Sequence, residues 1–326
     1  MSRRLLSLGG ILLATACATA PASKSARGGV SAAIETALAG AKGITAVAFY
    51  DLATGESAGR QERRRFHAAS TMKVPVLVEL YRAIGRGEIT ADRPVPIRNE
   101  FKSIMDGSPF VLLREEDGDP DLYAAVGESR PVEELARRMI QRSSNLATNL
   151  LIELLDPKKV TAEMRTLGAA DVEVLRGVED EKAFEAGLIN STTAHDLMVI
   201  LRAIAEKKAV SEAASAAMIE ILEGQEFKTK IPAGLPPGTR VANKTGDITG
   251  VHHDAAIVLP EGRAPYVLVV LTEGYPSEEE ADAAIAAVSK AVWQALTPGP
   301  SPPGRGEPNK ASAGRSPLSL RERGRG

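Results

Sequence analysis

The sequence contains one cysteine, Cys17, among its 326 residues. An intrachain disulfide is therefore impossible, and a structural zinc site built from thiolates is excluded. The four histidines form no His-Glu-x-x-His pattern, so a zinc metalloprotease has no support. Basic residues are not in excess, because the formal net charge is −2, and we expect no nucleic-acid partner. No internal repeat is present.

The composition of the sequence is that of an ordinary globular protein. Hydrophobic residues make up 44% and charged residues 25% of the chain, which suffices for a sizeable core. The length fits one large or two modest domains.

The amino terminus has the features of an export signal. Arg3 and Arg4 precede the short apolar run Leu5–Ala14, which is too short to span a bilayer, and small residues then lead to Cys17. Residues 1–17 resemble a bacterial signal peptide with a lipobox, in which Cys17 becomes the lipidated first residue. The alternative is plain secretion with cleavage near residues 16–20. Either interpretation places the mature protein outside the cytoplasm, and the first predicts a membrane-anchored periplasmic lipoprotein.

Two segments flank the expected folded body. Residues 18–29 are small and polar, as in a tether. Residues 298–326 are rich in Pro, Gly, Ser and Arg without apolar periodicity, so we expect a disordered tail. One domain is expected over 30–297.

Strand patterns occur near both ends of this domain, and helical patterns fill its middle. We expect strands at 44–51, shortly after the turn at 53–55, and at 240–244, 255–259 and 266–271, and helices at 31–41, 70–85, 132–155, 192–206, 211–223 and 277–296. The predicted fold is α+β: a mostly antiparallel sheet from about 30–69 and 212–297, flanked by helices, with an inserted all-helical part over about 70–211. The seam between the two parts is where a pocket is expected.

Ser70 opens the apolar helix, and Lys73 follows it by nearly one turn. The two side chains therefore share a helix face. A serine needs a base to become a nucleophile, and a partly desolvated lysine with a lowered pKa can serve as one. Serine is also a favoured helix cap, so this pair alone does not establish catalysis.

Two further polar elements lie downstream. Ser143-Ser144-Asn145 interrupts the second helical region, where Ser143 could donate a proton to a leaving nitrogen and Asn145 could bind a substrate amide; a polar break between helices is the alternative. Lys244-Thr245-Gly246 ends an expected strand and would hold a substrate carboxylate, with Gly246 permitting close approach. The backbone N–H groups of Asp247 and Ser70 would form an oxyanion hole.

The order of these three elements resembles the Ser-x-x-Lys, Ser-Asp-Asn and Lys-Thr-Gly set of class A β-lactamases and penicillin-binding proteins. The resemblance covers about residues 31–296 and includes the phrases at 66–70, 144–151 and 190–194. It implies a serine acyl-enzyme mechanism, a β-lactam or peptidoglycan-like substrate and no cofactor. We expect a monomer whose only membrane contact is a lipid anchor at Cys17.

Two positions depart from the family pattern. Ser144 stands where the pattern has aspartate, a residue that supports the cleft wall. The Glu-x-x-Leu-Asn signature of the deacylating glutamate is absent, and the corresponding stretch offers Glu179, with Glu181 as a second candidate. Further on, His252, His253 and Asp254 occupy the region in which some relatives place an arginine for the substrate carboxylate; His253 would replace it in part or be a packed surface histidine.

Three functions follow from these residues. The first is a β-lactamase, in which water activated by a glutamate frees Ser70. The second is a D,D-peptidase-like or esterase-like relative that acylates and releases product slowly. The third is a non-catalytic module that binds cell-wall fragments.

Overall fold

The computed structural model describes residues 27–297. The expected signal peptide, Cys17 and the tail at 298–326 lie outside the described residues. The expected tether does so only up to residue 26, because helix α1 (Arg27–Ala37) already begins at Arg27. Among residues 27–297 no helix has the length and apolarity that crossing a bilayer requires.

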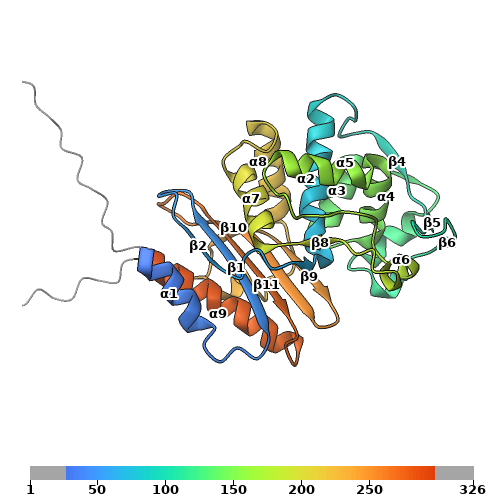
Figure 1. Ribbon diagram of the computed structural model, residues 1–326. Coiled ribbons are helices and arrows are strands. Elements are labelled where there is room, and N and C mark those ends of the chain that lie inside the picture. Colours follow the sequence, from blue (N-terminus) through green and yellow to red (C-terminus); the bar gives the residue numbers. More distant parts are fainter. Residues whose placement is uncertain (1–26, 298–326) are drawn as a thin grey trace, which may run out of the picture.

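The centre of the protein is an antiparallel five-stranded sheet in the order β2-β1-β11-β10-β9 (Figure 1). Its strands are β1 (Ile44–Asp51), β2 (Ser57–Arg60), β9 (Arg240–Ile248), β10 (Val251–Leu259) and β11 (Tyr266–Glu273). The expected β1–β2 hairpin is confirmed. Strands β9 to β11 are longer than expected, because residues outside the apolar runs, such as Gly246 and His253, also pair across the ladder.

Two terminal helices cover the outer face of the sheet. Helix α1 presents Val30, Ile34 and Leu38 at helical spacing, and α9 (Glu278–Leu296) runs beside it (Figure 1). The helix expected at 31–41 lies four residues earlier in the structure. Its buried stripe already begins at Val30, and the helix ends before Gly40, whose φ is +85°. The contact of α1 with α9 brings the two chain ends of the described region together.

The inner face of the sheet packs against α7 (Ala194–Ala205) and α8 (Glu212–Glu223), which join it to the helical body. Helix α7 was expected within the separate helical part, yet it lies directly on β1, β10 and β11. The body centres on α2 (Lys73–Gly85), whose residues are buried on nearly every side, as expected for a helix enclosed by others. Around it lie α3 (Val132–Gln141), α4 (Asn145–Leu155) and α5 (Pro157–Thr166).

Short elements complete the described part of the chain. They are β3 (Phe66–His67), η1 (Ala69–Met72), β4 (Pro94–Pro96), β5 (Phe101–Lys102), β6 (Pro109–Phe110), η2 (Arg114–Glu116), η3 (Pro120–Ala125), β7 (Ser129–Pro131), α6 (Glu181–Glu185), β8 (Ser191–Thr192) and η4 (Ile231–Gly234). The turn η1 lies against β9, so the start of α2 meets the edge strand of the sheet. All three sequence motifs converge on this seam.

Candidate active site

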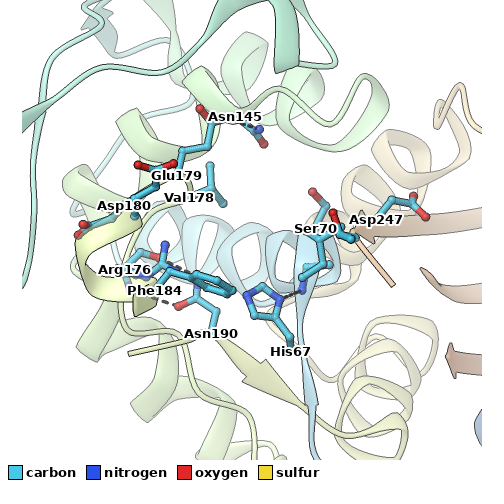
Figure 2. A pocket seen from close by; sticks show the side chains of 14 residues that line it. His67, Ser70, Asn145, Arg176, Val178, Glu179, Asp180, Phe184, Asn190 and Asp247 are labelled. Carbon is cyan, nitrogen blue, oxygen red and sulfur yellow. Dashed lines mark hydrogen bonds between the residues drawn. The ribbon is translucent and has the colours of Figure 1, made fainter. Parts of the chain in front are cut away.

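Ser70 lies in η1, one turn before the buried length of α2 begins. The residue before it, Ala69, has a φ of +44°, and its N–H donates to Nδ1 of His67 at 2.9 Å. Ser70 is half-buried and borders a pocket of about 400 Å³ with Asn145 and Glu179 (Figure 2). A second hollow on the side of Thr245 also reaches Ser70. The hydroxyl is therefore open to a ligand from the cleft.

Ser143, Ser144 and Asn145 form the corner between α3 and α4. The motif breaks the helical stretch, and Ser143 and Asn145 also border the cleft; the catalytic roles given to these two residues stay predictions. Ser143 adopts a φ of +60°, which directs its hydroxyl toward the two buried lysines. Ser144 is fully buried and caps α4 by accepting the N–H of Ala147 at 3.2 Å, so it supports the corner as expected.

Lys73 and Lys244 meet at Ser143. Lys73 Nζ lies 3.1 Å and Lys244 Nζ 3.0 Å from the Ser143 Oγ. Lys73 Nζ also donates to the Ser143 carbonyl at 2.7 Å and to Asn145 Oδ1 at 2.8 Å. Among residues 27–297, Ser70 Oγ makes no side-chain hydrogen bond. The amine of Lys73 binds the corner between α3 and α4 and not Ser70. Two amines therefore share a single hydroxyl beside the nucleophile.

Burial lowers the pKa values of both lysines. Desolvation lowers the pKa of Lys73 well below its ordinary value, and the charge of Lys244 lowers it further, against the opposing effects of Asp117 and Glu179. Desolvation likewise lowers the pKa of Lys244 to about 7. A lysine with such a pKa has a neutral amine available at neutral pH, which is what a general base for a serine requires.

Lys244, Thr245 and Gly246 lie within β9, not at its end as expected, since the strand continues to Ile248. Gly246 is required by the fold itself: a Cβ there would lie 2.9 Å from the backbone nitrogen of Ser70 and 2.9 Å from that of Thr71. The close approach thus brings β9 to the nucleophile's own turn. Thr245 borders the hollow beside Ser70, and its expected role in substrate binding stays a prediction.

The two candidate glutamates differ in placement. Glu179 Oε1 accepts from Asn145 Nδ2 at 2.7 Å, and Oε2 accepts from the N–H of Leu113 at 3.3 Å. Glu179 is half-buried and borders the pocket that contains Ser70 (Figure 2). Glu181, at the start of α6, borders the same pocket but is solvent-exposed. Burial raises the pKa of Glu179 above its ordinary value, which the hydrogen bond from Asn145 partly opposes. Asn145 thus bridges Lys73 and Glu179.

The segment at 252–254 differs from both expectations. His253 is fully buried. Its Nε2 lies 2.9 Å from the carbonyl oxygen of His67, and its Nδ1 lies 2.8 Å from the carbonyl oxygen of His252 and 3.1 Å from the backbone nitrogen of Thr272. It is therefore neither a surface histidine nor a ligand for a substrate carboxylate. Burial lowers its pKa to about 4, which keeps the ring neutral. Asp254 is also buried: it lies in the interior strand β10, where its Oδ1 accepts from Asn243 Nδ2 at 3.0 Å.

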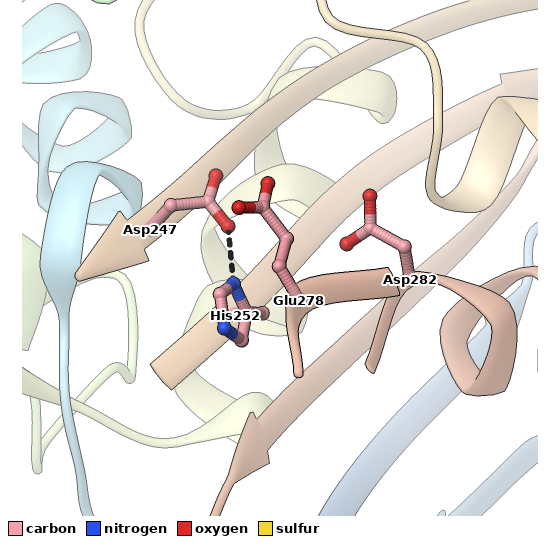
Figure 3. Close-up of side chains that lie close together, drawn as sticks. All are labelled: Asp247, His252, Glu278 and Asp282. Atoms are coloured by element: carbon pink, nitrogen blue, oxygen red, sulfur yellow. Dashed lines mark hydrogen bonds and ion pairs between the residues drawn. The ribbon is translucent and has the colours of Figure 1, made fainter. Parts of the chain in front are cut away.

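His252 belongs to an acidic group at the far end of the cleft, formed by Asp247, His252, Glu278 and Asp282 (Figure 3). These side chains are close enough to suggest a cation site. An ammonium already serves that purpose, because Lys230 Nζ lies 3.0 Å from a carboxylate oxygen of Asp247 and 3.0 Å from one of Asp282. We therefore assign this group to an ion-pair network and not to a metal.

Several residues at the site were not found from the sequence. Asn149 binds both backbone groups of Val178: it accepts the N–H at 2.7 Å and donates to the carbonyl at 3.0 Å. Asn190 Oδ1 accepts the N–H groups of Leu175 and Arg176. Both fix the loop that carries Glu179. They stand in the phrases at 144–151 and 190–194, which was the available signal. Asp117, which binds the start of α4, lies in a polar loop without any such signal.

Comparison with known proteins places this geometry in a family. Residues 29–296 match the model of the "Beta-lactamase enzyme family". The chain is 28% identical over 254 residues to a β-lactamase of Streptomyces fradiae, covering 76% of this chain and 80% of that protein. A β-lactamase from Sphaerobacter thermophilus superposes with a TM-score of 0.70 at 28% identity, covering 82% of this chain and 95% of the other. An ancestral class A β-lactamase gives a TM-score of 0.70 at 26% identity, covering 82% and 100%.

Proposed function

The chain belongs to the β-lactamase enzyme family, and from this premise we propose that it is a class A-like serine β-lactamase that opens the β-lactam amide through an acyl-enzyme on Ser70. The observation that carries the proposal is the meeting of Lys73 and Lys244 on the hydroxyl of Ser143, beside an accessible Ser70. Two buried amines then lie within hydrogen-bond distance of one hydroxyl, that of Ser143, and Ser143 borders the cleft together with Ser70.

The first half of the reaction forms the ester. Ser70 Oγ attacks the lactam carbonyl carbon, and its proton passes to the amine of Lys73. For this step the amine shifts from its contacts with Ser143 and Asn145 toward Ser70 once substrate is bound. The carbon–nitrogen bond breaks, and Ser143 gives its proton to the departing nitrogen and regains one from a neighbouring lysine. The N–H groups of Ser70 and Asp247 are proposed to stabilise the oxyanion.

Lys244 and Thr245 are proposed to bind the substrate carboxylate, since Thr245 borders the hollow and Lys244 Nζ lies on the Ser143 hydroxyl. In the second half, Glu179 takes a proton from water while the water oxygen attacks the ester carbonyl carbon. The bond between that carbon and Ser70 Oγ then breaks, Ser70 Oγ receives the proton held by Glu179, and the product leaves as a carboxylic acid. The hydrogen bond from Asn145 to Glu179 supports this role, because it holds the carboxylate at the pocket that Ser70 borders.

The test is hydrolysis of nitrocefin by purified protein. We expect turnover in the parent and none in Ser70→Ala, provided that the variant keeps the parental melting temperature. Intact mass after penicillin separates the alternatives: an adduct that forms and disappears supports a β-lactamase, whereas a long-lived adduct supports a D,D-peptidase-like relative. A parent that neither hydrolyses nitrocefin nor accepts an adduct contradicts the proposal and favours a binding module.

We further propose that the protein acts outside the cytoplasm as a lipoprotein anchored through Cys17, on the basis of the sequence before residue 27. Radiolabelled palmitate should enter the parent in a bacterial host, and Cys17→Ser should remove the label. Labelling unchanged by Cys17→Ser contradicts this anchor.

A further inference from the structure

A carboxylate from another part of the chain binds the start of α4. Asp117 follows the turn η2 and is only 7% exposed. Its Oδ1 and Oδ2 accept the N–H of Asn145 at 3.0 Å each, and Oδ2 also accepts the N–H of Leu146 at 2.9 Å. The hydroxyl of Tyr123 donates to Oδ2 at 3.0 Å. A buried anion therefore satisfies the free N–H groups of a helix start, where the helix dipole favours negative charge.

The loop that carries Asp117 is fastened on both sides of this contact. Gly118 packs so closely that a Cβ on it would lie 2.1 Å from the carbonyl oxygen of Arg142. Asp119 is fully buried and accepts from Arg138 at 2.8 Å and from Arg142 at 2.7 Å. The segment Asp117–Asp119 is thus clamped onto the corner between α3 and α4.

This corner holds the amine of Lys73. Both of the shortest contacts of that amine, to the Ser143 carbonyl and to Asn145 Oδ1, come from the two residues that flank Ser144. The hydroxyl of Ser144 caps the helix but carries no charge. The charged groups that face Lys73 are Lys244 from β9, Glu179 from the loop before α6, and Asp117, and the last two raise the pKa of Lys73 against the effect of burial.

We propose that Asp117 is a positioning residue for the acylation step: from a separate loop it supplies the carboxylate that the middle motif lacks at position 144, and so fixes Asn145 and the amine of Lys73. The inference rests on the proposed function for its kinetic part only. Its structural part, the restraint of the α4 start, holds for any activity of the site.

The test compares Asp117→Asn with Asp119→Asn, a matched change two residues away that weakens the clamp without removing a charge that faces Lys73. In Asp117→Asn we expect acylation of Ser70 by a fluorescent penicillin to slow about 10- to 100-fold, as for loss of one or two charge-assisted hydrogen bonds. The acid limb of the acylation rate should move to lower pH, because the pKa of Lys73 falls when a nearby anion is removed. In Asp119→Asn that limb should stay in place.

A rescue variant makes the proposal specific. In Asp117→Asn combined with Ser144→Asp, a carboxylate returns to the start of α4, and acylation should recover at least tenfold. If Asp117→Asn does not fold, the double variant should restore folding. An acid limb that moves equally in Asp117→Asn and Asp119→Asn, or a double variant that recovers neither acylation nor folding, overturns the proposal.

Amide hydrogen exchange gives a readout that does not depend on activity. The N–H groups of Asn145 and Leu146 should exchange faster in Asp117→Asn than in Asp119→Asn. If the parent is inactive toward β-lactams, the proposed function fails while this comparison still decides whether Asp117 restrains α4. Equal exchange in the two variants would contradict that restraint.

Discussion

Replacing Glu179 by glutamine should separate the two halves of the proposed reaction. Glutamine keeps the length of the side chain and an oxygen that can accept from Asn145, whose Nδ2 lies 2.7 Å from Glu179 Oε1. What the variant loses is the ability to take a proton from water. The amine of Lys73 and the Ser143 corner keep their direct contacts, so formation of the ester should be changed much less than its hydrolysis.

The expected magnitude follows from the role of a general base, which contributes about 10²- to 10⁴-fold. That range corresponds to roughly 3 to 5 kcal/mol of activation free energy in the deacylation step alone. Stability should change by less than about 1 kcal/mol, because the half-buried side chain keeps its shape and its pKa is already raised by burial. The variant should therefore accumulate an acyl-enzyme that the parent does not.

The assay is intact-mass spectrometry in single turnover with penicillin. Glu181→Gln is the matched control, because Glu181 borders the same pocket but is solvent-exposed and does not bind Asn145. The adduct in Glu179→Gln should persist at least a hundredfold longer than in Glu181→Gln. Equal lifetimes in the two variants would refute the assignment of Glu179 as the base. A parallel loss of acylation and deacylation would refute the separation of the two steps.

Two further predictions concern residues around the site. Gly246→Ala should destabilise the fold by about 1 to 3 kcal/mol and abolish nitrocefin hydrolysis, because its methyl group would press on the backbone nitrogen of Ser70; parental melting and activity would contradict this. His253 stays neutral in the fold with a pKa near 4, so below about pH 6.5 only the unfolded chain gains its proton and stability falls toward pH 4, by up to about 3 kcal/mol. In urea unfolding, the free energy of unfolding of His253→Gln should fall less between pH 7 and pH 4.5 than that of the parent. An equal fall in the two proteins would refute the role of His253.

Much of the fold could be predicted from periodicity. Strand β1 and the hairpin after it were found because apolar residues end at a clear turn, and α9 was found because its apolar pattern starts at the capping residue Ser277. Helices α5 and α6 were missed, since each is short and mostly polar and is stabilised by packing and caps that depend on the rest of the chain.

The same division applies to the site. Ser70, Lys73 and Lys244 could be singled out because their spacing and order form a motif. The structure places Ser70 in a cleft that Ser143 also borders, and it brings both lysine amines to the Ser143 hydroxyl. The roles assigned to them stay predictions. Asp117 could not be found, because its partners are backbone N–H groups far along the chain and no residue pattern records such a contact. The buried state of His253 was missed because polar residues in a strand give no apolar signal.

The protonation of the two buried lysines is the quantity on which the mechanism depends. It can be measured by NMR titration of ¹⁵N-labelled lysine side chains in the parent, with Lys73→Met to assign the resonance of Lys73. We predict that Lys73 titrates well below an ordinary lysine and Lys244 near pH 7, so that a neutral amine stands beside Ser70 under neutral conditions. Two resonances that titrate at or above the ordinary lysine value would contradict the account, because no base would then be available to activate Ser70.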